Sequence, residues 1–256
     1  MNTKQILKVI DKFAPLNSQD DWDNSGVQIC TSDKEIKRAL IALDITDAVI
    51  KEAIDNNIDL IITHHPLLFY PYQTVDVEFN PDRYIIKLVQ YDINVISFHT
   101  PFDKAKGGIN DYFLNKLGLK NIKAIDEYVR VGSFAKGIKL KDLAKKIANV
   151  SKQEGFVKVQ GDPDTIIKSV GMCSGSGGDM FHKALSYGAD VYISGDIKHS
   201  VALEAKDCGI CLIDAGHYGT ENCFIDDMYE LLSDKLKGKV KLYKTKTNQN
   251  PFDYTV

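Results

Sequence analysis

Apolar runs and amphipathic segments alternate along this chain. Uninterrupted apolar residues predict buried strands at 39–43, 59–63 and 94–98. Apolar residues three and four positions apart predict helices, the first over about 6–13 and the next beginning at Thr46, a favourable N-cap residue. The same patterns predict further helices at 82–91, 107–117, 140–150, 179–187, 201–206 and 220–237, and further strands at 156–160, 166–173, 191–194, 210–213 and 240–243.

Strand, helix and strand in succession at these lengths indicate βαβ units. The predicted fold class is therefore α/β, with two α/β lobes whose largely parallel or mixed sheets are flanked by helices. The charged, glycine-containing stretch 120–137 is the predicted seam, that is, the boundary between the two lobes. It predicts an N-terminal half over 1–125 and a C-terminal half over 126–256, and one intertwined domain is the alternative.

The composition narrows the classes of protein to be considered. Hydrophobic residues make up 44% of the chain and charged residues 26%, as in an ordinary globular protein. A formal net charge of -3 disfavours a protein that coats nucleic acid, and only three of the 32 basic residues are arginines, too few to clamp several phosphates. No run approaches the roughly 20 apolar residues of a membrane span, and the N-terminus does not resemble a signal peptide. We expect a cytoplasmic protein with no membrane partner.

The five cysteines are scattered and too few for a disulfide scaffold. Cys208 and Cys211 have the Cys-x-x-Cys spacing, but no second pair exists that would complete a zinc site. A redox dithiol also favours a first cysteine at a helix N-terminus, which this one does not occupy. Two packed apolar cysteines are the favoured interpretation.

Side chains that can bind metals follow several predicted strands. His64 and His65 follow strand 59–63, His99 and Asp103 follow strand 94–98, and Asp196 follows strand 191–194. Ligands of open α/β sheets bind beyond the carboxyl ends of the strands, so this topology gathers the residues at one rim. Imidazoles mixed with carboxylates suit zinc, manganese, iron, cobalt or nickel without selecting among them.

His64-His65-Pro66 is the sharpest of these pieces. Adjacent residues within a strand point to opposite faces, but a following proline changes the direction of the chain and lets both rings converge. One surface histidine beside one packed histidine is the alternative.

His217 and Glu221 are four residues apart, so a helix beginning near 217 would place both on one face. That spacing occurs in pairs of metal ligands. The alternative is a helix start without further function, because Thr220 and Glu221 also suit an N-terminus. Similar alternatives apply to His99 as a core histidine and to Asp103 as a turn residue.

A glycine-rich segment with Ser174, Gly175, Ser176 and Gly177 lies between a predicted strand and a predicted helix. Its backbone N–H groups can cradle an anion, although it is neither a Walker loop nor a regular Gly-x-Gly-x-x-Gly motif. A tight strand-to-helix turn without a ligand is the alternative.

Six segments, taken in order, resemble the NGG-interacting-factor-three family, whose bacterial members are named GTP cyclohydrolase 1 type 2 homologues. They run through the whole chain, and together they are far more specific than any one alone. They are 22–28 (WDNSGVQ), 62–66 (ITHHP), 99–103 (HTPFD), 173–177 (CSGSG), 192–196 (YISGD) and 214–221 (DAGHYGTE). One departure is Pro101-Phe102, where members often carry Asn-Leu, which alters the loop without removing Asp103.

The resemblance implies a site for two divalent metal ions per subunit. The family's ligands fall on His64, His65, Asp103, His217 and Glu221, and His99 matches a further histidine close to the metals. The resemblance also implies a homo-oligomer, typically a hexameric ring with sites facing an inner cavity. This chain is too short for the middle domain inserted in some relatives.

A metal-dependent hydrolase follows as the expected function, acting on a nucleotide or another phosphate-containing small molecule through a metal-bound hydroxide. Glu221 is the expected bridging carboxylate, and His99 and Asp196 are the expected catalytic or proton-shuttling residues. GTP ring opening is the reaction that the family name implies. The alternatives are a non-catalytic metal-binding or regulatory protein and a ring-shaped nucleic-acid binder, the latter disfavoured by the net charge.

Overall fold

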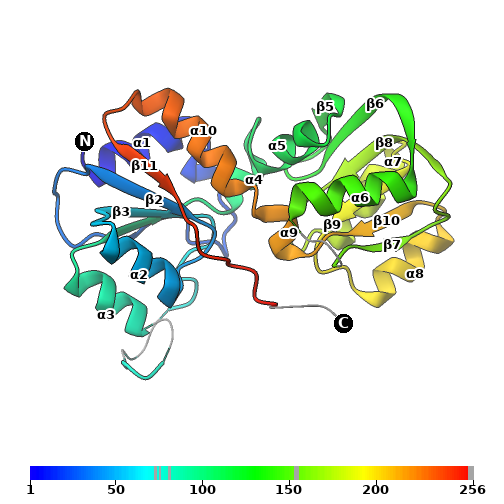
Figure 1. Cartoon of the computed structure of the whole chain (residues 1–256). Coiled ribbons are helices and arrows are strands. Elements are labelled where there is room, and N and C mark those ends of the chain that lie inside the picture. The colour runs from blue at the N-terminus through cyan, green and yellow to red at the C-terminus, as the bar shows by residue number, and fades with distance from the viewer. Residues whose placement is uncertain (72–73, 75, 80–81, 153–155, 253–256) are drawn as a thin grey trace. The chain divides into compact units, whose positions relative to one another are not determined.

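A computed structural model describes residues 1–71, 74, 76–79, 82–152 and 156–252 of the chain (Figure 1). The chain divides into two compact units. Unit 1 consists of Met1–Ala105 and Phe224–Gln249, and unit 2 consists of Lys106–Cys223 with the segment from Asn250. No helix among the described residues is both long and apolar enough to cross a membrane.

Unit 1 contains a five-stranded sheet in the order β1-β4-β3-β2-β11. Its strands are β1 (Gly26–Ile29), β2 (Arg38–Ala42), β3 (Leu60–Thr63), β4 (Asn94–Ser97) and β11 (Lys241–Lys244). The strands are parallel except β1, which runs antiparallel to β4. Thr63 is in register with both Ala42 and Ser97, so the three central strands end level with one another.

Helices cover both faces of this sheet (Figure 1). The helices α1 (Thr3–Asp11) and α10 (Phe224–Leu236) lie on one face, and α2 (Asp47–Asp55) and α3 (Asp82–Gln90) on the other. Asn2 begins α1 with a capping box to Gln5, and Thr46 caps α2 through its side chain. A short helix α4 (Thr100–Lys104) follows β4, and a 3-10 turn η1 (Leu16–Ser18) precedes β1.

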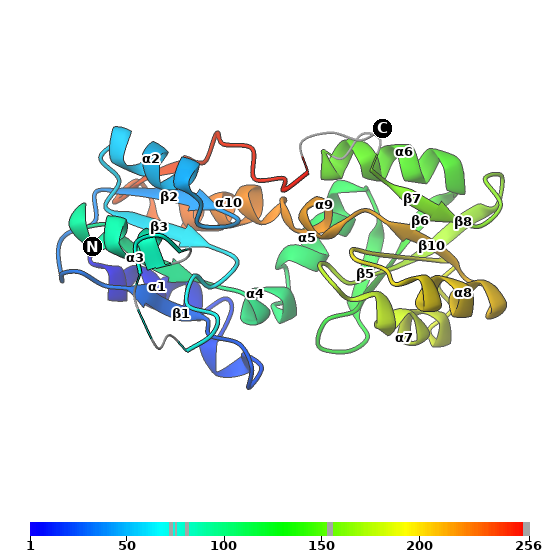
Figure 2. The ribbon, with the colours of Figure 1, turned by 90° about the horizontal axis from the view of Figure 1, so that it is seen from below.

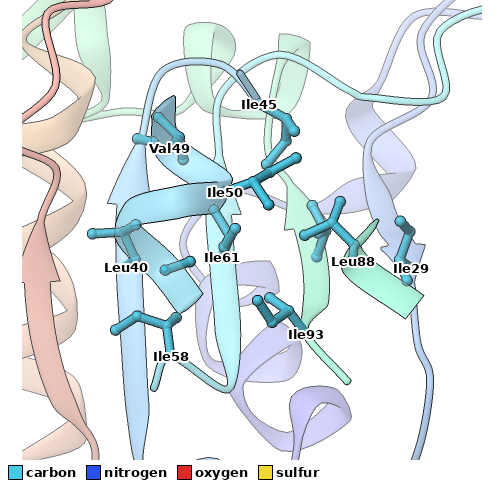
Figure 3. Close-up of a cluster of buried hydrophobic side chains, with 12 residues drawn as sticks. Ile29, Leu40, Ile45, Val49, Ile50, Ile58, Ile61, Leu88 and Ile93 are labelled. Carbon is cyan, nitrogen blue, oxygen red and sulfur yellow. The ribbon is translucent and has the colours of Figure 1, made fainter. Parts of the chain in front are cut away.

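The apolar core of unit 1 lies between the sheet and the helices α2 and α3 (Figure 3). Leu40 and Ile61 project from the strands toward Val49 and Ile50 of α2 and Leu88 of α3, and all are almost fully buried. Burying one such side chain contributes about 1.5–3 kcal/mol. This packing fixes the strands whose ends carry the candidate site.

Unit 2 contains a six-stranded sheet in the order β5-β6-β8-β9-β10-β7. Its strands are β5 (Lys120–Ala124), β6 (Arg130–Lys139), β7 (Lys158–Gln160), β8 (Ile166–Met172), β9 (Val191–Ser194) and β10 (Cys211–Asp214). The central strands β8, β9 and β10 are parallel, whereas the outer pairings are antiparallel. The sheets of both units are therefore mixed.

The helices of unit 2 also cover two faces (Figure 2). The helices α6 (Leu140–Ser151) and α9 (His217–Glu221) lie on one side of the sheet, and α7 (Phe181–Ser186) and α8 (His199–Asp207) on the other. Tyr192, Phe181 and Ala205 belong to the apolar cluster under α7 and α8. The remaining elements are α5 (Ile109–Lys116) and a 3-10 turn η2 (Gly178–Met180).

The predicted α/β class with mixed sheets and flanking helices is confirmed, but several boundaries differ. The stretch 120–137, predicted as a seam, forms the paired strands β5 and β6, so residues 106–125 belong to unit 2 rather than to an N-terminal half ending at 125. Residues 224–249 return to unit 1 because β11 pairs in parallel with β2. The helix predicted over 220–237 is two helices, α9 and α10.

Candidate metal centre

Three histidines gather at the carboxyl ends of β3 and β4 in unit 1. His64 and His65 directly follow β3, and His99 follows β4 after one residue. One ring nitrogen from each of the three lies within 4.8 Å of those of the other two. The ring centroid of His64 lies 4.9 Å from that of His65 and 5.1 Å from that of His99. This grouping follows from strands that end level with one another.

Backbone and hydroxyl contacts make the adjacent rings of His64 and His65 converge. The N–H groups of both residues donate to the Leu43 carbonyl, at 3.2 and 3.1 Å, which pulls the chain out of the strand direction. The hydroxyls of Thr63 and Ser97 both donate to the His65 carbonyl, at 2.9 and 3.2 Å. The turn is therefore held by the neighbouring strands as well as by Pro66.

Each of the three histidines has its Nδ1 atom hydrogen-bonded to an oxygen. The partner is the Phe98 carbonyl for His64, at 2.9 Å, and Asp44 Oδ1 for His65, at 2.7 Å. For His99 the partner is Asp23 Oδ1, at 3.0 Å. A proton held on Nδ1 in this way places the ring's lone pair on Nε2, the arrangement found around metal-ligating histidines.

Asp103 joins this group from the short helix α4. Its Oδ1 lies 3.6 Å from His64 Nε2, and its side chain is almost fully buried. Pro101 lies in the first turn of α4, and the Asp103 N–H donates to the His99 carbonyl at 3.2 Å. Asp103 therefore lies on a helix whose start is set by the end of β4, rather than in an open turn.

Asp23 holds His99 in place. Burial alone would raise the pKa of Asp23, but hydrogen bonds from His99, Thr100 and Ser25 hold that pKa well below its ordinary value. Thr100 Oγ1 donates to Asp23 Oδ2 at 2.6 Å, and Ser25 Oγ donates to the same oxygen at 2.7 Å. An ionised carboxylate is thus fixed behind the His99 ring.

Unit 2 carries a second donor group on α9. His217 Nε2 lies 3.0 Å from Glu221 Oε2, one helical turn away, and Glu221 is only 3% exposed. His217 Nδ1 is hydrogen-bonded to Asp196 Oδ2 at 2.8 Å and lies 3.3 Å from Ser176 Oγ. The fourth histidine of the candidate set therefore has the same Nδ1-to-oxygen arrangement as the three in unit 1.

Two glycines allow the elements of unit 2 to approach this pair. A Cβ atom on Gly195 would lie 2.6 Å from the His217 nitrogen and 2.7 Å from the Gly216 carbonyl carbon, both of them backbone atoms. A Cβ atom on Gly175 would lie 2.3 Å from Glu221 Oε1, and Gly175 also has a φ of +60°. Both positions therefore require glycine for the donors to lie where they do.

The glycine-rich loop packs around the same donors. The Ser174 N–H donates to Asn110 Oδ1 at 2.7 Å, and the Gly175 N–H donates to Thr220 Oγ1 at 2.9 Å. The Gly177 carbonyl accepts a hydrogen bond from the Tyr192 hydroxyl at 2.7 Å. An anion would compete with side chains for two of the loop's N–H groups, and anion binding by residues 174–177 stays a prediction.

The remaining histidines and the Cys-x-x-Cys pair lie outside these groups. His182 is exposed and pairs with Glu204 at 3.0 Å, and His199 begins α8. Burial raises the pKa of the Cys211 thiol, as expected of a packed cysteine, but Cys208 is exposed. The expectation that both cysteines are packed is therefore wrong for Cys208.

The oxygen partners of the histidines in unit 1 were not predicted from the sequence. Asp23 lies within the 22–28 segment but was given no role there, and Asp44 directly follows the predicted strand 39–43. A carboxylate directly after a buried strand, next to a strand that ends in histidines, is the signal that would have indicated Asp44.

Comparison with known proteins places these residues in a family. The family model described as Duf34/NIF3 (NGG1p interacting factor 3) matches residues 1–251. The chain belongs to this family. Among its NIF3 relatives is a GTP cyclohydrolase 1 type 2 homolog of Clostridium perfringens, 31% identical over 99% of this chain and 100% of the relative.

Two further proteins are similar to this chain over most of its length. A protein of the same name from Clostridium acetobutylicum is 35% identical over 86% of this chain and 85% of the relative. The crystal structure of the Staphylococcus aureus hypothetical protein SA1388 superposes with a TM-score of 0.93 at 28% identity, covering 100% of this chain and 99% of that chain. The α/β fold with two mixed sheets is therefore that of solved NIF3 structures.

Proposed function

We propose that this chain binds two divalent metal ions and hydrolyses a nucleotide or another phosphate-containing small molecule. The proposed metal ligands are His64, His65, Asp103, His217 and Glu221. The observation that carries the proposal is the shared arrangement of His64, His65, His99 and His217. Each has Nδ1 bonded to a carbonyl or carboxylate oxygen, which leaves Nε2 of His64, His65 and His217 for a metal and Nε2 of His99 for a proton.

The donor set fits divalent transition metals. His64, His65 and His217 offer imidazole nitrogens, and Asp103 and Glu221 offer carboxylate oxygens. Zinc, manganese, iron, cobalt and nickel all accept this mixture.

The side chains have distinct roles in this proposal. Bound divalent ions supply Lewis acidity and make a coordinated water more acidic. Glu221 would hold the ions through its two carboxylate oxygens. His99, whose Nδ1 proton is held by ionised Asp23, accepts a proton at Nε2 from water or returns one to the leaving group. Asp196 orients His217 through Nδ1.

Metal stoichiometry tests the first half of the proposal. We expect elemental analysis of the reconstituted protein to give two ions per chain, and His64→Ala and Glu221→Ala each to give fewer. His182→Ala is the matched control, because His182 is exposed and its imidazole pairs with Glu204 rather than with a candidate donor, and it should retain both ions. Unchanged stoichiometry in both donor variants, with circular dichroism like that of the parent, would refute the site.

Turnover tests the second half. The relatives' name, GTP cyclohydrolase 1 type 2 homolog, makes GTP the first substrate to assay, beside ATP, GMP and ribose 5-phosphate. We expect metal-dependent hydrolysis that His99→Ala reduces by about 100-fold or more while the metal content is retained. Full metal occupancy with only background hydrolysis of every compound would favour a non-catalytic metal-binding protein. The hexameric ring stays a prediction, for which analytical ultracentrifugation is the measurement.

A further inference from the structure

One exposed and one half-buried aromatic side chain lie beside the histidines of unit 1. Trp22 is 58% exposed, and its ring centroid lies 5.6 Å from that of His99, with the two rings edge to face. Phe69 comes from the segment after β3. Its ring centroid lies 6.0 Å from that of Trp22 and 6.1 Å from that of His99. These two residues, Trp22 and Phe69, are called the aromatic platform below.

Polar side chains of the 22–28 segment hold the aromatic platform together. Asn24 Nδ2 donates to the Leu68 carbonyl at 2.6 Å, and Gln28 Oε1 accepts from the Leu68 N–H at 3.0 Å. Gln28 Nε2 also donates to the Asn24 carbonyl at 2.6 Å. The residue before Phe69 is thus tied on both its N–H and its carbonyl to the loop that carries Trp22.

We propose that the aromatic platform stacks against a planar heteroaromatic ring of the substrate, with a nucleobase as the ring that fits the proposed function. The inference rests on that function and names the part of the substrate that is recognised. Asn24 and Gln28 are then positioning residues, which keep the two rings in place before a ligand arrives.

The position of the aromatic platform supports this assignment. A ring stacked on Trp22 lies against His99, which belongs to the same cluster as His64 and His65. The rest of a nucleotide is then within reach of the candidate metal donors. Stacking is sequence-tolerant and substantial, because every base presents a π-face to an aromatic side chain.

The three arginines have other partners, so stacking of an arginine on the substrate ring is not expected. Arg130 is buried and bonded to Asp111, and Arg83 pairs with Asp47. Arg38 reaches the Asn56 carbonyl. Each of the chain's three arginines is therefore engaged with a partner in its own unit.

The fluorescence of Trp22 provides a direct test, because it is the only tryptophan in the chain. The full-length protein is titrated with guanosine 5′-monophosphate and, separately, with ribose 5-phosphate, with and without metal. We expect saturable quenching by the nucleotide and none by the sugar phosphate. Absence of saturable quenching by the nucleotide, or equal quenching by both compounds, would overturn the proposal.

Variants separate stacking from general damage. Phe69→Ala keeps the fluorescent reporter and should weaken nucleotide binding about tenfold. Trp22→Ala should do so at least as strongly by equilibrium dialysis, whereas Trp22→Phe should bind within about threefold of the parent, because a π-face remains. Tyr91→Ala is the matched control, since Tyr91 is an aromatic residue of unit 1 that is 56% exposed. Equal affinities for Trp22→Ala and the control would contradict the platform.

Two measurements keep this proposal distinct from its alternatives. Metal content determined on the same samples distinguishes the two proposals: two ions without quenching refutes the platform alone, and quenching without metal refutes the proposed function alone. If a second copy of the chain covers Trp22 instead, acrylamide quenching of its fluorescence falls as the protein concentration rises. That result would overturn the assignment to a substrate ring.

Discussion

The two units present their candidate donors by different means. In unit 1 the three histidines lie at the ends of two strands, and partners from other parts of the chain, such as Asp44 and Asp23, orient them. In unit 2 both donors lie on one short helix, four residues apart. The first arrangement depends on the register of a sheet, whereas the second depends on close backbone approach at two glycines. The two groups should therefore fail under different substitutions.

Gly195→Ala should have the largest effect on unit 2. The added methyl group would meet backbone atoms of Gly216 and His217 at 2.6–2.7 Å, and backbone cannot rotate away as a side chain can. We expect the free energy of unfolding to fall by about 3 kcal/mol, as for severe overpacking, together with loss of metal bound by His217. Urea denaturation and elemental analysis measure the two effects.

Gly209→Ala is the control for that experiment. Gly209 also lies in unit 2, has a φ of +78°, and has no atom within 4 Å of the position of an added Cβ. Its substitution should cost only the backbone strain, about 1 kcal/mol, with metal content unchanged. Equal stability of the two variants would show that close approach at Gly195 is unimportant.

Asp44→Ala should weaken metal binding in unit 1 without a comparable loss of stability. The substitution removes the oxygen that accepts from His65 Nδ1 at 2.7 Å, so the ring loses its orientation and some basicity. Such partners typically affect metal affinity by about 10–100-fold. Competition with a chromophoric chelator measures the change, and Asp55→Ala, which removes only an exposed pair with Lys51, should leave the affinity unchanged.

Asp196→Ala should have a smaller effect than Asp44→Ala, below about tenfold in metal affinity. The Asp196 side chain is 54% exposed, against 38% for Asp44, and Ser176 Oγ also lies 3.3 Å from His217 Nδ1 and can replace it. The double variant Asp196→Ala/Ser176→Ala should match Asp44→Ala. If Asp196→Ala alone lowered the metal affinity as much as Asp44→Ala, the expected difference between the units would be contradicted.

Asp47→Asn should have the smallest effect, because packing rather than charge holds α2 and α3 on the sheet. A hydrogen bond from Lys87, together with the charges of Lys87 and Arg83, holds the pKa of Asp47 below its ordinary value of 3.8. The folded chain thus favours the carboxylate, so the stabilisation is present above that pH and is lost as pH falls through the lower pKa. At neutral pH we expect a loss of about 0.5 kcal/mol for this exposed group.

Thermal unfolding across pH checks that expectation. The parent and Asp47→Asn should differ at pH 7 and should converge in strongly acidic solution. A difference that persists unchanged there would point to packing at Asp47 rather than to its charge.

The sequence predicts local features better than distant ones. Four-residue spacing was enough to propose His217 and Glu221 on one helical face, and α9 begins at His217. Most apolar strands were located within one or two residues because buried parallel strands are continuously apolar. By contrast, β5 and β6 were read as a seam because much of their length is exposed and charged, and only pairing with β8 makes them part of a sheet.

The oxygen partners of the histidines also could not be predicted from local sequence patterns. Asp23 is 76 residues from His99 in sequence, and Asp44 is 21 residues from His65. Their contacts depend on strand register and loop packing, which the spacing of residues along the sequence does not predict. The return of residues 224–249 to unit 1 was missed for the same reason, since the parallel pairing of β11 with β2 joins segments about 200 residues apart.

The pairing of β11 with β2 can form only late in the synthesis of the polypeptide. A ribosome releases β2 early, but β11 emerges only after the whole span Lys106–Cys223 has been synthesised. Through that interval the hydrogen-bonding edge of β2 lacks its final neighbour, and an open edge invites pairing with other nascent chains. Unit 2, nearly contiguous in sequence, can condense first. Because synthesis is vectorial, formation of the segment 224–249 is the step that closes unit 1 and ends its exposure to aggregation.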